Sequence, residues 1–87
     1  MLDRIRNEFP VFEKHPELIF LDTAASAQKP KSVIESINNC YSNKYANIHR
    51  GIYKLSTNLT DEFENVRMKT SKYINAESAD NIVFTKS

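Results

Sequence analysis

The sequence predicts an α/β fold, because two short apolar runs enclose a region of helical periodicity. The runs cover residues 18–21 and 82–84, and each is continuous rather than alternating, as in a strand buried on both faces. Between them, apolar residues recur at three- and four-residue intervals over 30–43 and 56–75. Strands separated by helices are typical of α/β proteins. We therefore expect helices over these two ranges and short strands at about 18–21 and 82–85.

The two prolines at positions 10 and 30 mark expected helix boundaries. Residues 3–8 have the pattern of a short amphipathic helix, and Pro10 should end it because proline lacks the N–H that continues a helix. Pro30 suits the first turn of the helix over 30–43, where a missing N–H costs nothing.

The helix over 56–75 has the clearest signals in the chain. Acidic residues precede basic ones, which is the order that the helix dipole favours, and any of three polar residues at 56–58 could cap its start. One stripe at helical spacing is expected to face the core. It consists of Leu59, Phe63, Val66, Thr70 and Tyr73.

Composition limits the classes of function. The chain has 87 residues, enough for one domain, and its net charge of +1 gives no reason to expect a nucleic acid or a membrane as partner. No apolar run approaches the roughly 20 residues that span a bilayer. The single cysteine, Cys40, cannot form an internal disulfide and suits a reducing compartment, so we expect a cytoplasmic protein. We expect no metal site.

Three single residues are considered separately, namely Cys40, Gly51 and His15. Cys40 falls on the apolar stripe of the 30–43 helix with Val33 and Ile37, and a buried small hydrophobe explains it better than a reactive thiol. Gly51 is the one glycine in the sequence, and we expect it to supply a backbone conformation that other residues resist. His15 is expected to be a surface loop histidine.

The sequence contains two long motifs and three shorter ones. Residues 21–30 read L-D-T-A-A-S-A-Q-K-P, and residues 47–56 read N-I-H-R-G-I-Y-K-L-S. The shorter motifs are R-N-E-F-P at 6–10, E-N-V-R at 64–67 and A-D-N-I-V-F-T at 79–85. Together they resemble the N-terminal part of the SufS-type cysteine desulfurases, which are class-V aminotransferases, and all five occur in that family's order over nearly the whole chain.

The resemblance implies that residues 1–87 are a single segment of a fold type I enzyme that depends on pyridoxal 5′-phosphate (PLP). Such enzymes have a large domain around a seven-stranded sheet and a smaller domain formed by both chain ends. The implied reaction converts L-cysteine to L-alanine and passes the sulfur on as a persulfide. A homodimer and a sulfur acceptor protein are implied as partners, and iron–sulfur cluster assembly as the destination of the sulfur.

The family's Schiff-base lysine and persulfide cysteine have no counterpart motif in this sequence, which reaches the first residue of the family's phosphate-binding turn at Ser87. We therefore expect no catalytic residue here and no stable binding of PLP. The lysines at 29, 31, 44, 54, 69, 72 and 86 are interpreted as surface charges.

By resemblance, the residues near the substrate would be Ala24, Ala25, His49 and Arg50. The arginine fork suits a substrate carboxylate. A site role and a solvated loop explain His49 and Arg50 equally well in a whole enzyme, whereas a solvated loop is the better explanation when the segment is isolated.

Two interpretations of function remain open. In the first, the chain is an N-terminal fragment of a PLP-dependent cysteine desulfurase and is inactive by itself. In the second, it is a non-catalytic interaction module that binds a full-length desulfurase or a complementary fragment. Because apolar strands without neighbours promote association, self-association is expected in either case.

Overall fold

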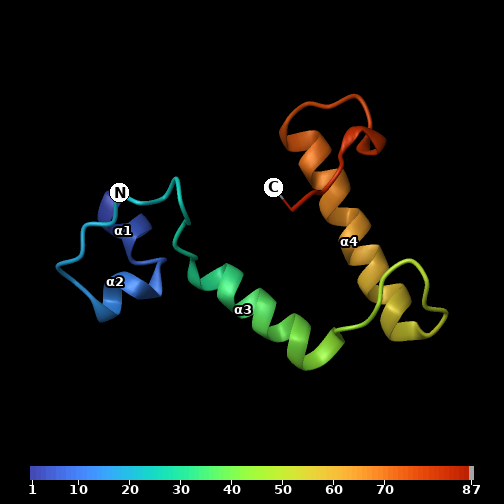
Figure 1. The fold of residues 1–87 in the computed structure, drawn as a ribbon, viewed down its shortest axis with the longest axis horizontal. Coiled ribbons are helices and arrows are strands. Elements are labelled where there is room, and N and C mark those ends of the chain that lie inside the picture. Colours follow the sequence, from blue (N-terminus) through green and yellow to red (C-terminus); the bar gives the residue numbers. More distant parts are fainter. Residues whose placement is uncertain (87) are drawn as a thin grey trace. The chain divides into compact units, whose positions relative to one another are not determined.

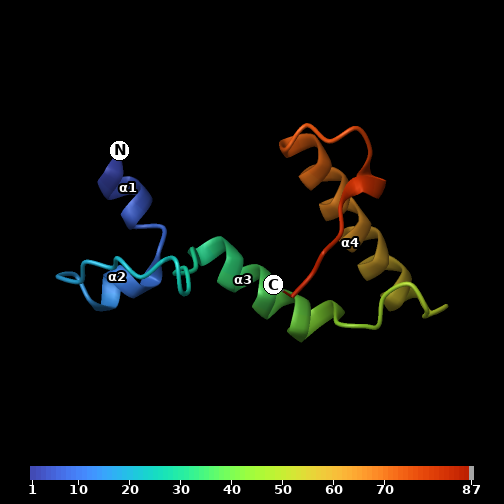
Figure 2. The ribbon, with the colours of Figure 1, turned by 45° about the horizontal axis from the view of Figure 1, so that its top comes forward.

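A computed structural model describes residues 1–86, and these residues contain helices and no strand. The chain divides into two compact units, the first covering Met1–Asn43 and the second beginning at Lys44 (Figures 1 and 2). No helix within the described part of the chain is both long and apolar enough to cross a bilayer.

The first unit contains three α-helices. They are α1 (Leu2–Arg6), α2 (Pro10–Lys14) and α3 (Lys31–Asn39), and a π-helical turn, η1 (Cys40–Lys44), continues α3. The helix predicted over 30–43 is confirmed as α3 with this turn. The expected role of Pro10 is only half right, because it follows the end of α1 and also begins α2 as that helix's first residue. A proline at this position loses no helical hydrogen bond, since that N–H has no partner within the helix.

Arg6 closes the loop that follows α2. Its Nη2 atom donates to the carbonyl oxygens of Pro16 (3.0 Å) and Leu18 (2.8 Å). Its guanidinium carbon lies 4.0 Å from the centre of the Phe12 ring, within the range of a cation–π contact. Phe9 meets Phe12 edge to face at 6.2 Å. One arginine therefore satisfies two loop carbonyls while it covers an aromatic pair.

The second unit is built on α4 (Lys54–Tyr73), which is followed by a 3₁₀ turn, η2 (Ala79–Asn81). Helix α4 confirms the helix predicted over 56–75, but it begins two residues earlier, after Tyr53, and no side chain caps it. Its end is a Schellman motif, because Asn75 has a left-handed φ of 58° and the N–H of Ala76 bonds to Ser71 O at 2.8 Å.

The predicted apolar stripe of α4 is wrong in part. Val66 is 52% exposed and Tyr73 is 91% exposed, whereas the two buried residues of the helix are Ser56 and Ser71. The packed face instead follows the segments that fold back onto α4, including the chain after η2, which runs beside the helix in both views (Figures 1 and 2). Ile82 of that segment is buried.

The two expected strands are not formed in the described residues. Residues 18–21 and 82–85 have no strand partner, and Ile19, Leu21 and Val83 are 79%, 90% and 77% exposed. The strand predicted at 82–85 is wrong, although the backbone is extended at Ile82, where φ is −95° and ψ is 122°. A strand also needs a neighbour to accept its hydrogen bonds, and the described residues supply none. Self-association through these exposed residues stays a prediction.

Replacing Arg6 with lysine should open the loop that follows α2. Lysine keeps the charge but loses the planar fork that reaches two carbonyls and a ring. We expect a cost of about 1–2 kcal/mol, since hydrogen bonds from charged donors contribute roughly that much at partly exposed sites. Amide exchange at Leu18, whose N–H bonds to His15 O at 3.0 Å, should then accelerate by about tenfold. The control is Arg4→Lys in the same helix, and equal exchange rates in the two variants would contradict the role of Arg6.

Candidate functional site

Ala24 and Ala25 lie in a tight turn of the first unit. The N–H groups of Ala25 and Ser26 both bond to Asp22 O, at 3.0 and 3.2 Å, and both alanine side chains are exposed. An apolar hollow of about 270 Å³ is nearby, but neither alanine lines it. Its lining consists of Phe9, Phe12, Phe20, Thr23, Ala27 and Gln28. The turn thus presents two small side chains to the surroundings, as close approach of another group would require.

His49 and Arg50 belong to the second unit, where a turn packs against α4. His49 has a φ of 68°, in the left-handed region, which costs a residue with a Cβ about 1–2 kcal/mol. Its backbone N–H donates to Thr60 Oγ1 at 2.9 Å, and its ring meets Phe63 edge to face at 5.6 Å. Contacts with α4 thus hold this conformation, and the next residue, Arg50, is exposed.

The His49 ring is also bound by a carboxylate of α4. Nε2 of His49 lies 2.7 Å from Glu64 Oε1, and Arg67 Nε donates to Glu64 Oε2 at 2.9 Å. Arg67 extends further, with Nη1 donating to Ile82 O at 2.5 Å and its guanidinium carbon 5.0 Å from the Phe84 ring centre. Three charged or titratable side chains therefore form one connected row.

These contacts lower the pKa of the Glu64 carboxyl below its ordinary value of 4.5. The hydrogen bond from Arg67 is the largest cause and the hydrogen bond with His49 is the second, while partial desolvation opposes them. Glu64 is consequently ionised across the neutral range.

Gly51 has a different role from the one expected of it. Its φ is not positive, so the unusual conformation of this turn is carried by its neighbour His49. A Cβ at position 51 would instead overlap the Ser56 side chain and approach Tyr53 Cε1 to 3.0 Å. The hydroxyl of Ser56 is buried there and donates to Asn47 O. The turn needs glycine because it packs directly on the first turn of α4.

The structure brings His49 and Arg50 together in one turn and places Ala24 and Ala25 in the other unit. Their nearness to a substrate stays a prediction. Sequence reasoning missed Glu64 and Arg67 as partners of His49. Their spacing of three residues on a helix signals a pair with each other, but nothing in the sequence indicates a contact with a residue 15 positions away.

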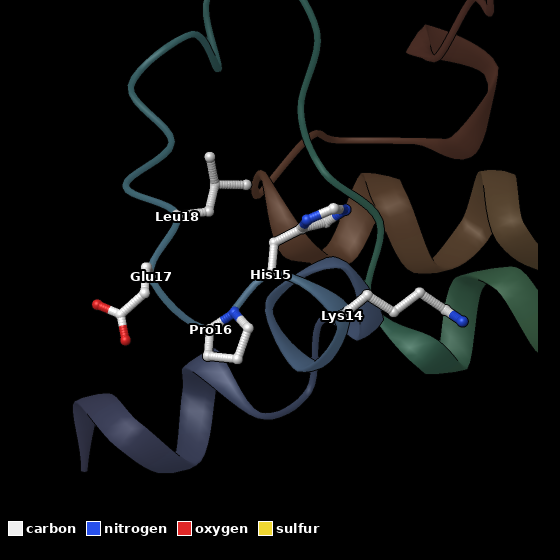
Figure 3. A pocket seen from close by; sticks show the side chains of 5 residues that line it. All are labelled: Lys14, His15, Pro16, Glu17 and Leu18. Carbon is white, nitrogen blue, oxygen red and sulfur yellow. The ribbon is translucent and has the colours of Figure 1, made fainter.

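The surroundings of the other candidate residues, Cys40 and His15, are less suited to a functional site. Cys40 is half-buried in the π-helical turn, less covered than expected, and Val33 and Ile37 are 41% and 51% exposed. His15 is exposed, as expected, in an open hollow of about 500 Å³ lined by residues 14–18. Figure 3 shows Glu17 pointing away from His15, so the polar groups there do not converge. Residues 1–86 contain no group of three side chains suited to a metal ion.

Comparison with known proteins places the chain in a family. The model of the aminotransferase class-V family matches residues 19–87. The chain belongs to this family. It is 48% identical over 81 residues to the cysteine desulfurase SufS of Plasmodium falciparum, covering 93% of this chain and 15% of that protein. It is 44% identical over 88 residues to a cysteine desulfurase of Escherichia coli, covering 98% of this chain and 22% of that protein.

A solved structure agrees with these matches. The apo cysteine desulfurase of Thermococcus onnurineus superposes with a TM-score of 0.83 at 33% identity, over 97% of this chain and 20% of that one. The chain thus spans between about one seventh and just over one fifth of the length of these relatives. It is a short part of the fold of PLP-dependent enzymes.

The residues present do not fit PLP. A Schiff-base lysine has to be desolvated and placed beside an anchor for the cofactor phosphate. Of the eight lysines, seven are exposed, and Lys44 is half-buried in an ion pair with Glu62 at 2.8 Å. No step through the cofactor can be derived from these side chains.

The lowered pKa of Glu64 predicts a loss of stability in acid. A carboxyl whose folded pKa lies below its unfolded value stabilises the fold fully above the unfolded value, and this contribution is lost as the pH falls through the folded one. Stability should therefore decline below about pH 4.5. In a ¹³C NMR titration, the Glu64 carboxyl should show a midpoint below 4.5, and Arg67→Met should bring it back toward that value. A midpoint at or above 4.5 in the unaltered chain would contradict the network.

Proposed function

We propose that the chain is the opening segment of a PLP-dependent cysteine desulfurase. The observation that carries the proposal is its similarity to cysteine desulfurases over nearly its whole length, at 48% and 44% identity. The proposed enzyme removes sulfur from L-cysteine, leaves L-alanine, and holds the sulfur as a persulfide on a cysteine outside this segment. A homodimer and a sulfur acceptor protein complete the proposal, with iron–sulfur cluster assembly as the destination of the sulfur.

Within that enzyme, the exposed turn of the second unit would contribute to binding the substrate. Arg50 is exposed and has no ion pair among residues 1–86, and a guanidinium fork binds both oxygens of a carboxylate. The small side chains of Ala24 and Ala25 would allow a substrate to approach their turn closely. We place the protein in the cytoplasm, where a free thiol such as that of Cys40 stays reduced.

The isolated chain should not turn over cysteine, because its lysines are exposed or ion-paired and Cys40 lies outside any matched motif. A second candidate function is the non-catalytic interaction module. The exposure of Ile19 and Leu21 in the first unit, and of Val83 in the second, favours it, since another chain could cover apolar side chains that are exposed in each unit.

A chimaera tests the main proposal. In it, this chain replaces the matching region of the E. coli desulfurase. We expect the chimaera to retain PLP through gel filtration and to form alanine with a kcat/KM within about tenfold of the parent. Arg50→Lys should raise the KM for cysteine by about tenfold with a smaller effect on kcat, because lysine loses the second hydrogen bond to the carboxylate. Arg4→Lys is the matched control.

Two outcomes would contradict the proposal: a soluble, PLP-loaded chimaera that forms no alanine, or several turnovers by the isolated chain. Tight binding of the isolated chain to the intact E. coli enzyme in analytical ultracentrifugation, together with an inactive chimaera, would favour the interaction module.

A further inference from the structure

The contacts of His49 with α4 are more extensive than a surface loop needs. Its backbone N–H is held by Thr60 (2.9 Å), its ring edge by Phe63 (5.6 Å between ring centres) and its Nε2 by Glu64 (2.7 Å). Thr60 is fixed in turn, since its hydroxyl donates to Ser56 O at 2.8 Å. The three contact residues lie within about one turn of one helix. Both the backbone and the ring of His49 are therefore oriented.

The hydrogen bond to Glu64 decides which ring nitrogen carries the proton. An ionised carboxylate only accepts hydrogen bonds, so Nε2 must be the donor. Oε2 of Glu64 is occupied by Arg67 Nε at 2.9 Å, which fixes the carboxylate and leaves Oε1 for His49. In the neutral ring the proton then resides on Nε2, and Nδ1 carries the lone pair. Nδ1 has no hydrogen-bond partner among residues 1–86.

Arg67 is suited to hold this carboxylate because it is itself held at several points. Its Nη1 donates to Ile82 O at 2.5 Å, and its guanidinium carbon lies 5.5 and 5.0 Å from the ring centres of Phe63 and Phe84. Its side chain is 21% exposed, whereas that of Glu64 is 44% exposed. Arg67, which is less exposed than Glu64, therefore holds Glu64 in place and, through it, His49. Arg67 also connects the turn to the segment after η2.

We propose that Glu64 and Arg67 are positioning residues for His49: they fix the neutral ring in the Nε2–H form, so that Nδ1 is left as a hydrogen-bond acceptor in the turn that also carries the exposed Arg50. The ligand that fits such a turn is a small molecule with a carboxylate for the guanidinium and a donor N–H or S–H group for Nδ1. An amino acid with a thiol has both groups. The choice of ligand rests on the proposed function, while the placement of the ring does not.

The placement of the ring is tested on the 87-residue chain itself. In a long-range ¹H–¹⁵N spectrum of the neutral imidazoles, we expect Nδ1 of His49 to have the shift of an unprotonated nitrogen and Nε2 that of a protonated one. His15 is exposed and its ring has no hydrogen-bond partner among residues 1–86, so it gives the shifts of a solvated tautomer mixture in the same spectrum. Identical shifts for the two histidines would overturn the proposal.

Three variants separate positioning from general stability. Glu64→Leu should move the His49 shifts to those of His15, and Arg67→Lys should move them part of the way. Asp61→Leu, at an exposed position of the same helix, should leave them unchanged. Leucine is a good helix former, so both leucine variants should keep the helical content seen by circular dichroism. Unchanged His49 shifts in Glu64→Leu, with α4 intact, would also overturn the proposal.

The choice of ligand is tested in the chimaeric enzyme described above. Glu64→Leu should lower kcat/KM for L-cysteine by about tenfold, the smaller end of what loss of an orienting partner costs, and Asp61→Leu should not lower it. An active chimaera that is unaffected by Glu64→Leu would overturn the assignment of the ligand. A chimaera that is inactive before any substitution would count against the proposed function, and the NMR result would still decide the placement of His49.

Discussion

The second unit depends on hydrogen bonds between side chains of α4 and the backbone of two neighbouring segments, the turn at 47–51 and the chain after η2. Ser56 donates to Asn47 O, Thr60 accepts the N–H of His49, and Arg67 donates to Ile82 O. These three positions lie four and seven residues apart, so they fall along one face of the helix. Backbone groups that leave water need partners, and this face provides them for both neighbouring segments. The turn and the segment after η2 are thus placed by hydrogen bonds more than by burial of large apolar groups.

In each unit, an arginine binds a backbone carbonyl and an aromatic ring at the place where a strand was expected. In the first, Arg6 binds the carbonyl of Leu18 and contacts the ring of Phe12. In the second, Arg67 binds the carbonyl of Ile82 and contacts the ring of Phe84. In both cases an arginine satisfies a carbonyl at the start of an apolar segment that has no regular secondary structure. A guanidinium can do this because it combines several donors with a flat face that packs on aromatic rings.

The sequence was sufficient to predict the two longer helices, because the signals that predict them are local. Periodicity predicted α4 and the helix containing α3 to within a few residues. It failed where the outcome depends on contacts distant in sequence: the apolar runs at 18–21 and 82–85 lack neighbours to pair with in the described residues, and Tyr73 of the expected core stripe is exposed. The face that α4 packs is set by the segments returning to it, which periodicity in one helix cannot reveal. His49 and Arg50 were singled out by a motif, but the motif said nothing of Glu64.

The turn at 47–51 shows why glycine and serine are needed where the turn packs on α4. The buried residues of α4 are both serines, and Gly51 lies so close to Ser56 that a methyl group there would overlap it. Because the backbone packs this tightly on the helix, His49 has to take the left-handed conformation in order to direct its N–H at Thr60. Three contacts with α4 offset the cost of that conformation. The close packing of Gly51 and the orientation of His49 are therefore two consequences of one constraint, namely that the turn has almost no space between itself and the first turns of α4.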